Sequence, residues 1–180
     1  QDLKKESNHY PAWQLTDRQI CDLELLLNGG FSPLDGFMGK ADYNSVLKNM
    51  RLDNGALWPM PITLDITEEF ASKIKDVEKI TLRDQEGFTL AILTITDIWE
   101  PNKDEEAQMV YGTTDSTHPA VNYLKNKSNK MAVGGKLEGI SLPHHYDYQK
   151  NRHTPEELRS IFIQNGWDKI VAFQTRNPLH

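Results

Sequence analysis

Cysteine pairs, long apolar runs and an excess of positive charge are all missing from this sequence of 180 residues. Its single cysteine, Cys21, cannot form an internal disulfide, and no apolar run approaches the roughly 20 residues that cross a bilayer. The first residues, QDLKKESNHYPAW, lack the apolar centre of a signal peptide. Together these absences predict a cytoplasmic protein that does not enter a membrane.

Acidic residues outnumber basic residues, with 26 Asp and Glu against 20 Lys and Arg and a formal net charge of -6. Broad attraction to the phosphates of nucleic acid is therefore not expected, and an anionic ligand must be held by a local site. The sequence contains no GxxxxGK[ST] pattern, which excludes a P-loop kinase module from these residues. Because 38% of the residues are apolar and 26% are charged, the composition is ordinary for a folded domain.

Short helices and strands are predicted to alternate irregularly through most of the chain. Thr16 begins a capping-box pattern, T-D-R-Q, which predicts a helix that runs to about Asn28 and buries Cys21 among apolar neighbours. Further helices are expected at 41–50, 67–73, 104–111 and 119–126, and strands at 57–66, 77–83, 88–98, 130–134 and 136–142. The pair Gly134-Gly135 is expected to interrupt the last two strands. This order favours a compact mixed β-barrel over repeated parallel units.

The polar and aromatic segment PHHYDYQKNRHTP, which has a proline near each end, is the candidate boundary between two domains. We expect the first domain at residues 1–148 and the second at 149–180. In the second domain Thr154 opens a capping box, so a helix is predicted from there to Gly166. The apolar run KIVAF, residues 169–173, is then predicted to be a strand buried on both faces of a parallel sheet. Helix, strand and polar loop in this order indicate the start of a doubly wound α/β domain.

The sequence QTRNPLH follows this predicted strand, at the position where open parallel sheets bind ligands. Arg176 offers a permanently charged, forked donor that suits tetrahedral oxyanions. Neutral donors come from Gln174, Thr175 and Asn177. His180 stands at or just before the next expected helix, whose N-terminus favours phosphate. A polar loop after a buried strand can simply be solvated, but these donors together favour an oxyanion and phosphate site.

QTRNPLH is similar to the first half of the ATP sulfurylase signature, which reads Q-x-R-N-P-x-H and continues to a second histidine. Other segments also resemble that family: CDLELLLNGGFSPLDGFM, LWPMPITLDI, AILTITDIWEPNK, HPAVNYL, VGGKLEGI and HYDY. The resemblance covers the chain from about Leu15 to His180, especially to the sulfurylase part of bifunctional enzymes that make activated sulfate. It implies a PUA-like mixed β-barrel for residues 1–148 and the beginning of a Rossmann-like nucleotidyltransferase domain for residues 149–180.

The resemblance further implies sulfate adenylyltransferase activity, in which ATP and sulfate give adenosine 5'-phosphosulfate and pyrophosphate during sulfate activation and assimilation. It assigns sulfate binding to Gln174 and Arg176. It assigns ATP binding to a set that comprises Gln174, Thr175, Asn177 and His180. Thr175, Arg176 and Asn177 are then the expected catalytic residues. ATP is expected as a substrate with Mg2+, no protein-bound metal is expected, and positioning and preorganised donors leave no need for a catalytic acid or base.

The sequence ends inside the signature, before the second histidine, so the chain is expected to lack useful activity by itself. The complete protein is expected to form a homo-oligomer, with an adenylylsulfate kinase either fused to it or separate. Two alternatives remain open: a PUA-like module that binds RNA or protein, and a different adenylyltransferase of the same superfamily. A metal site at His144, His145 and Asp147 is a less favoured interpretation, because adjacent histidines on a linker are more often simply exposed.

Overall fold

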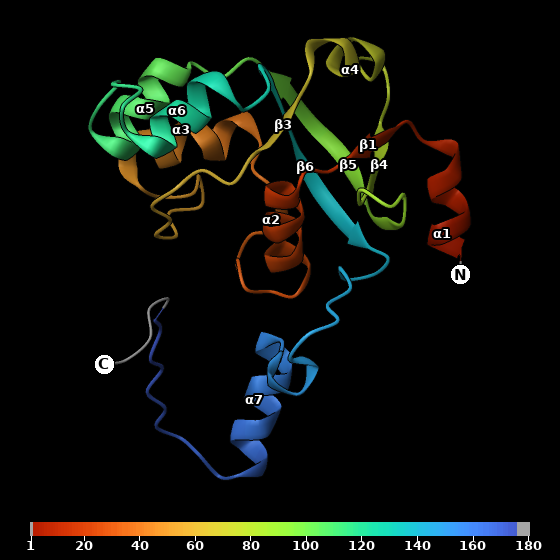
Figure 1. Cartoon of the computed structure of the whole chain (residues 1–180), viewed down its shortest axis with the longest axis vertical. Helices are drawn as coiled ribbons and strands as arrows, with labels where there is room; N and C mark the ends of the chain where they lie inside the picture. Colours follow the sequence, from red (N-terminus) through yellow and green to blue (C-terminus); the bar gives the residue numbers. More distant parts are fainter. Residues whose placement is uncertain (1, 176–180) are drawn as a thin grey trace. The chain divides into compact units, whose positions relative to one another are not determined.

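The structure is a computed structural model that describes residues 2–175. The chain divides into two compact units, Gln1–His144 and His145–His180, and each is described by itself. The first unit contains a mixed sheet and several helices (Figure 1). Among the described residues of the second unit, the regular elements are the 3-10 helix η2, Gln149–Asn151, and the helix α7, Pro155–Gln164.

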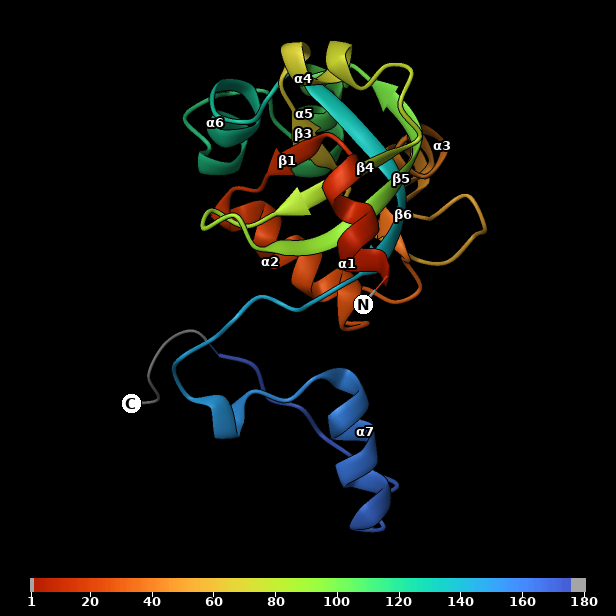
Figure 2. The same cartoon turned by 90° about the vertical axis from the view of Figure 1, so that its right-hand side faces the viewer.

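A six-stranded mixed sheet forms the centre of the first unit. Its strands are β1 Ala12–Gln14, β2 Gly36–Phe37, β3 Leu64–Ile66, β4 Lys79–Arg83, β5 Thr89–Trp99 and β6 Met131–Gly139. They lie in the order β1-β4-β5-β6-β2, and β3 pairs with β6 beside this path. The pair β1 and β4 is parallel, and the other pairs are antiparallel. The long strands β5 and β6 run side by side (Figure 2). The sheet combines parallel and antiparallel pairs, which agrees with the predicted mixed β-barrel.

Helices pack around this sheet. They are α1 Asp2–Glu6, the 3-10 helix η1 Ser7–His9, α2 Asp17–Leu27, α3 Lys40–Asn49, α4 Glu68–Lys73, α5 Lys103–Tyr111 and α6 Pro119–Asn126. The helix α5 packs against both α3 and α6 (Figure 1). Every helix predicted in this part of the chain is confirmed, because its signals are local. Thr67 and Asn102, for example, each accept a hydrogen bond from the backbone amide three residues later.

The helix α2 begins with the predicted capping box. The Gln19 amide donates to the Thr16 hydroxyl at 3.3 Å, and the Thr16 amide donates to the Gln19 side-chain oxygen at 3.1 Å. The buried face of the helix carries Gln19, Leu23 and Leu26. The prediction that Cys21 is buried is wrong, because Cys21 lies nearly opposite Gln19 and Leu23 around the helix and is exposed.

The main hydrophobic core lies between the sheet and the helices α2 and α4. Leu23, Ile66 and Ile80 are completely buried there. Burial of an aliphatic side chain of this size contributes roughly 1.5–3 kcal/mol to stability. A smaller cluster holds α3 against β5 and β6, and in it the rings of Tyr43 and Trp99 lie 5.6 Å apart.

The strand predicted at 57–66 is shorter than expected. Only its end, β3, pairs with the sheet. Pro59 and Pro61 provide no backbone amide to a hydrogen-bonded ladder, so the chain reaches the sheet only after them.

The two strands predicted on either side of Gly134-Gly135 are one continuous strand, β6. The two glycines do not interrupt the strand; they allow neighbouring backbone segments to approach β6 closely. A Cβ atom at Gly134 would lie 2.2 Å from the carbonyl oxygen of Met38, and one at Gly135 would lie 2.0 Å from that of Thr94. Any side chain here would therefore push β6 away from its neighbours.

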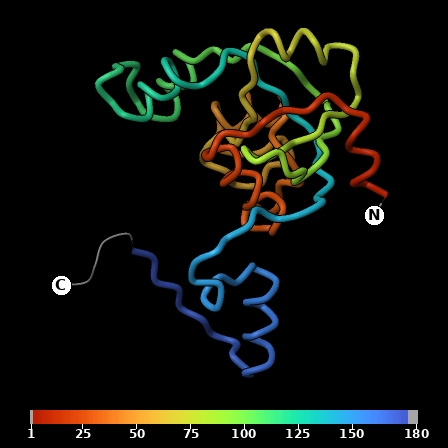
Figure 3. The backbone as a smooth tube through the Cα atoms, turned by 45° about the vertical axis from the view of Figure 1, so that its right-hand side comes forward, coloured from red at the N-terminus to blue at the C-terminus, as the bar shows by residue number. Residues whose placement is uncertain are grey.

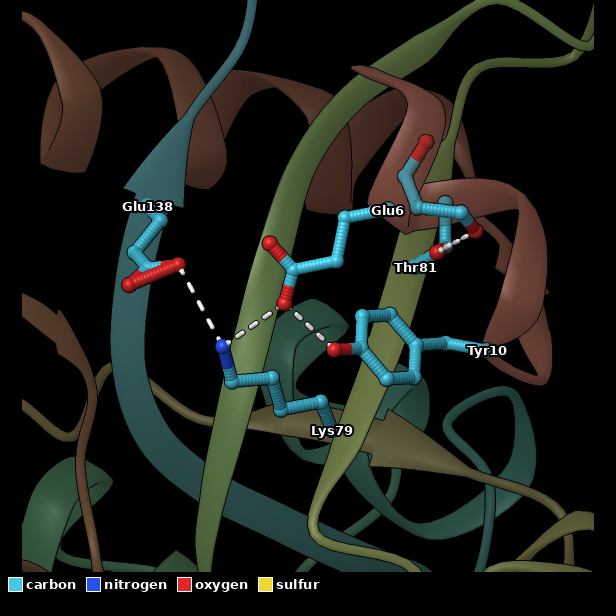
Figure 4. Close-up of polar contacts among 6 residues, drawn as sticks. Glu6, Tyr10, Lys79, Thr81 and Glu138 are labelled. Atoms are coloured by element: carbon cyan, nitrogen blue, oxygen red, sulfur yellow. Dashed lines mark hydrogen bonds and ion pairs between the residues drawn. The ribbon is translucent and has the colours of Figure 1, made fainter. Parts of the chain in front are cut away.

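Polar contacts fasten the N-terminal helices to the sheet (Figure 4). The Lys79 ammonium lies 3.1 Å from a Glu6 carboxylate oxygen, which also accepts a hydrogen bond from the Tyr10 hydroxyl. The hydrogen bonds from Tyr10 and Lys79 lower the pKa of the Glu6 carboxyl. Nearby, the buried Thr81 hydroxyl donates to the backbone carbonyl of Ser7 at 2.6 Å. These bonds hold α1 and η1 beside β4.

Candidate functional site

The helix α7 precedes the predicted ligand-binding loop. Thr154 and Glu157 form the predicted capping box: the Glu157 amide donates to the Thr154 hydroxyl at 3.2 Å, and the Thr154 amide donates to the Glu157 carboxylate at 2.7 Å. Pro155 occupies the first turn, where a missing amide costs no intrahelical hydrogen bond. The predicted helix is therefore confirmed, and local chemistry fixes its start.

A tight reversal of the chain follows α7. Gly166 has a positive φ of 66°, and the Trp167 amide donates to the Phe162 carbonyl at 2.9 Å. The ring centroids of Phe162 and Trp167 lie 6.4 Å apart. Beyond this turn the chain runs back in the direction from which α7 came (Figure 3).

The strand predicted at 169–173 is wrong for the residues that the structure describes. Residues 167–175 have no regular secondary structure, and the side chains of Val171 and Phe173 are 95% and 76% exposed. A parallel strand needs a neighbouring strand for its backbone hydrogen bonds, and residues 145–175 contain none. The apolar run therefore has no sheet within these residues in which to be buried.

Gln174 and Thr175 are the predicted site residues that the structure describes, and both are exposed. An amide and a hydroxyl at adjacent positions can donate hydrogen bonds to an anion, although neither carries a charge. The other predicted site residues, Arg176, Asn177 and His180, lie outside the described residues. The described part of the loop therefore supplies neutral donors, and the permanent positive charge of the motif belongs to Arg176.

The segment before α7 is ordered by an arginine. Arg152 donates to both the carboxylate and the backbone carbonyl of Asp147, each at 3.0 Å. The hydrogen bond from Arg152 lowers the pKa of the Asp147 carboxyl.

Within residues 2–175, no group of three or more His, Cys, Asp and Glu side chains is arranged to hold a metal ion. Over the same residues, no helix combines the length and the apolar character needed to cross a membrane.

Two family models match the chain. Residues 1–142 match a PUA-like domain, and residues 149–180 match ATP-sulfurylase. The first match covers well over half of the chain, so the chain belongs to the PUA-like domain family, with an ATP-sulfurylase segment after it. The predicted fold class and the resemblance to ATP sulfurylase are thereby confirmed.

Curated relatives carry the name sulfate adenylyltransferase. The protein of Kluyveromyces lactis is 52% identical over 175 residues, which are 97% of this chain and 35% of the relative. That of Saccharomyces cerevisiae is 50% identical over 97% of this chain and 34% of the relative, and that of Schizosaccharomyces pombe is 47% identical over 99% and 37%. The chain thus spans about a third of the length of these relatives.

A solved structure is similar over nearly the whole chain. The hexameric APS kinase from Thiobacillus denitrificans superposes with a TM-score of 0.78 and is 35% identical. The match covers 99% of this chain and 31% of that one. The structural match, like the sequence matches, therefore covers nearly all of this chain and about a third of a longer protein.

Proposed function

We propose that the complete protein is a sulfate adenylyltransferase, which joins sulfate to the α-phosphorus of ATP and releases pyrophosphate. The observation that carries this proposal is the ATP-sulfurylase match over residues 149–180, which contain QTRNPLH. Identity of about half over nearly the whole chain to proteins named sulfate adenylyltransferase supports it. Because the chain spans about a third of those relatives, the activity is proposed for the complete protein and not for these residues alone.

The proposed roles of the loop residues follow their chemistry. Gln174 and Arg176 bind sulfate, because a neutral amide and a forked cation together suit a doubly charged tetrahedral anion. Thr175 and Asn177 donate to the reacting phosphates, and His180 holds phosphate oxygens of ATP. Thr175, Arg176 and Asn177 touch the reacting groups and are the proposed catalytic residues. Gln174 also lies within reach of the nucleotide in this proposal.

The proposed reaction needs no side-chain nucleophile. A sulfate oxygen forms a bond to the α-phosphorus while the bond from that phosphorus to the pyrophosphate oxygen breaks, and the leaving electron pair stays on pyrophosphate. The main difficulty is to bring one anion against another, which the donors of the loop reduce by positioning and by offsetting negative charge. Mg2+ enters with ATP as part of the substrate and helps pyrophosphate to leave.

We also propose a domain boundary between residues 148 and 149 and a cytoplasmic homo-oligomer. The division of the structure after His144, and the gap between the family matches at residues 142 and 149, support a boundary in this region. A relative described as hexameric supports assembly, and its description as an APS kinase is in line with a kinase that acts on adenosine 5'-phosphosulfate, fused or separate. ATP, sulfate, adenosine 5'-phosphosulfate and pyrophosphate are the proposed small-molecule partners.

The decisive assay is sulfate-dependent exchange of labelled pyrophosphate into ATP by the complete protein. Arg176→Gln should lower the exchange rate by about a hundredfold, because one preorganised charged donor is lost. Lys169→Gln is the matched control, since it removes one positive charge from an exposed position of the same segment, and it should retain most of the rate. The 180-residue chain alone should show no exchange, and addition of the remaining segment as a separate polypeptide tests whether activity returns.

Two results would contradict the proposal. One is a folded complete protein without sulfate-dependent exchange. The other is equal loss of rate in the Arg176→Gln and Lys169→Gln variants. A salt-sensitive shift of RNA by the inactive protein would instead support the PUA-like domain as an RNA-binding module.

A further inference from the structure

A small polar cavity lies in the first unit, among the helices α2, α5 and α6 and the segment that leads into β3. Its volume is about 60 Å³. That volume admits about four water molecules or a ligand of a few non-hydrogen atoms. All of its lining residues belong to the first unit, whereas the loop to which the proposed function assigns catalysis belongs to the second.

Two charged side chains of the lining already have partners. Asp65 accepts hydrogen bonds from the Gln19 amide group at 2.8 Å and from the backbone amide of Asn129 at 2.7 Å. Lys103 donates to the carbonyl and the hydroxyl of Ser128 at 2.8 and 2.9 Å. These two residues therefore form part of the cavity wall, and most of their hydrogen-bonding groups are already used by neighbouring residues.

Two carboxylates of the lining are less well satisfied. Over residues 2–175, the Asp22 carboxylate accepts no hydrogen bond and forms no ion pair, and the Glu106 carboxylate accepts one hydrogen bond, from the Tyr43 hydroxyl at 2.8 Å. Burial raises the pKa of both the Asp22 and the Glu106 carboxyl. The exposed Arg18 guanidinium lies 4.4 Å from the centroid of the Tyr123 ring. It forms no close ion pair in the described structure, but its positive charge acts against burial by lowering the pKa of both the Asp22 and the Glu106 carboxyl.

We propose that this cavity binds a small molecule that carries a primary ammonium group, which donates hydrogen bonds to the carboxylates of Asp22 and Glu106. An ammonium group has three donors and a compact positive charge, so it can bond to both acids at once. The charged side chains of the lining include three carboxylates and two cations, and a bound cation balances this excess. Arg18 at the rim is placed to accept the anionic end of a zwitterion.

An NMR titration of the 15N-labelled 180-residue chain tests the proposal. Ethanolamine and glycine each carry a primary ammonium group, whereas glycolate is an anion of similar size. The two ammonium ligands should shift amide signals of α2 and α5 in a saturable way, and glycolate should not. Tighter binding of glycine than of ethanolamine would identify the zwitterion as the preferred ligand, with Arg18 holding its carboxylate.

Variants connect such binding to the two acids. Asp22→Asn and Glu106→Gln should each weaken ethanolamine binding about tenfold, because each removes a charge-assisted hydrogen bond. Glu105→Gln is the matched control, since Glu105 is an exposed neighbour on α5 that does not line the cavity, and its affinity should be unchanged. Amide dispersion and the thermal midpoint report whether each variant is folded. Asp22 has no hydrogen bond to lose, and the amide oxygen that Glu106→Gln introduces can still accept from the Tyr43 hydroxyl, so both variants are expected to fold.

Several results would overturn the proposal. These are no saturation by either ammonium ligand at about ten millimolar, binding of glycolate as strong as that of ethanolamine, or equal affinities in the Asp22→Asn and Glu105→Gln variants.

Discussion

Replacement of Gly135 by alanine should strongly destabilise the first unit. The new Cβ atom would lie 2.0 Å from the carbonyl oxygen of Thr94 in β5, whereas real Cβ atoms essentially never approach within 3.0 Å of another heavy atom. On its other side Gly135 meets β2, since a Cβ atom at Gly36 would lie 1.9 Å from the Gly135 carbonyl oxygen. Neither the strand β6 nor its neighbours can relieve the overlap by rotating a side chain, because the atoms involved are backbone.

The size of the effect follows from the separation that the strands would need. Moving β5 away from β6 by about 1 Å stretches the flanking hydrogen bonds well beyond their favourable length. Each lost hydrogen bond costs about 1 kcal/mol net, so the loss of about three bonds around Gly135 would cost roughly 3 kcal/mol. For a domain of this size such a loss lowers the thermal midpoint by about 10 °C.

Urea unfolding of the 180-residue chain, followed by circular dichroism, measures this loss. Gly139→Ala is the control on the same strand, where the nearest atom is a flexible Leu27 methyl group at 3.2 Å. It should change the free energy of unfolding by less than about 1 kcal/mol. Equal destabilisation by Gly135→Ala and Gly139→Ala would refute the explanation of the glycine pair as a site of close backbone contact.

Three other substitutions test separate parts of the first unit, and a fourth tests the loop. Thr16→Ala should cost about 1 kcal/mol in urea unfolding by removing the cap of α2, and Thr16→Ser should cost little. The hydrogen bond from Tyr10 is the main cause that lowers the pKa of the Glu6 carboxyl below its usual 4.5. The ionised carboxylate therefore stabilises the fold above pH 4.5, and this contribution is lost as the pH falls through the lowered pKa. Glu6→Gln should make the free energy of unfolding depend less on pH in the acid range. Burial raises the pKa of the Glu106 carboxyl above 4.5, so its contribution to stability is present below pH 4.5 and is lost as the pH rises through the raised pKa. Glu106→Gln should therefore gain stability relative to the wild type as the pH rises above 4.5, and a relative loss would show that nearby cations outweigh burial. In the complete protein, Gln174→Ala should lower kcat/KM for sulfate by about tenfold and leave KM for ATP less affected, and an unchanged kcat/KM would remove Gln174 from the sulfate site.

Local chemistry explains which parts of the fold could be predicted from the sequence. The capping boxes at Thr16 and Thr154 each involve residues three apart, so the pattern is complete within one turn of helix. The exposure of Cys21 could not be predicted in the same way. Which side of an amphipathic helix faces inward depends on the sheet against which it packs. The buried side of α2 includes the polar residue Gln19, so the pattern of apolar residues did not identify that side clearly.

Contacts between distant segments explain the remaining differences. Gly134-Gly135 has the composition of a turn, and its actual role depends on Met38 and Thr94, which come from other parts of the chain. The apolar run at 169–173 has the composition of a buried strand, but burial needs neighbouring strands that residues 145–175 do not contain. For both segments, the composition therefore showed which kinds of residue are present but did not predict the structure that the segment adopts.

The loop QTRNPLH and the cavity of the first unit also differ in whether their residues are close together in the sequence. The chemistry of QTRNPLH could be read from consecutive residues, since its donors are adjacent in the chain. The acids of the cavity, Asp22 and Glu106, come from different helices, and no spacing in the sequence relates them. Only the packing of α5 and α6 beside α2 brings those carboxylates to one place.

The parallel pairing of β1 with β4 has a consequence for solubility. β1 lies at the end of the strand order, so it covers hydrogen-bonding groups of β4 that would otherwise face solvent. An uncovered strand with buried residues such as Ile80 and Leu82 is a template for pairing with a second chain. Removal of residues 1–14, which end with β1, should therefore promote self-association of the first unit, which light scattering would detect. We therefore expect β1 to protect the domain from aggregation, although it lies far along the chain from the loop to which we assign catalysis.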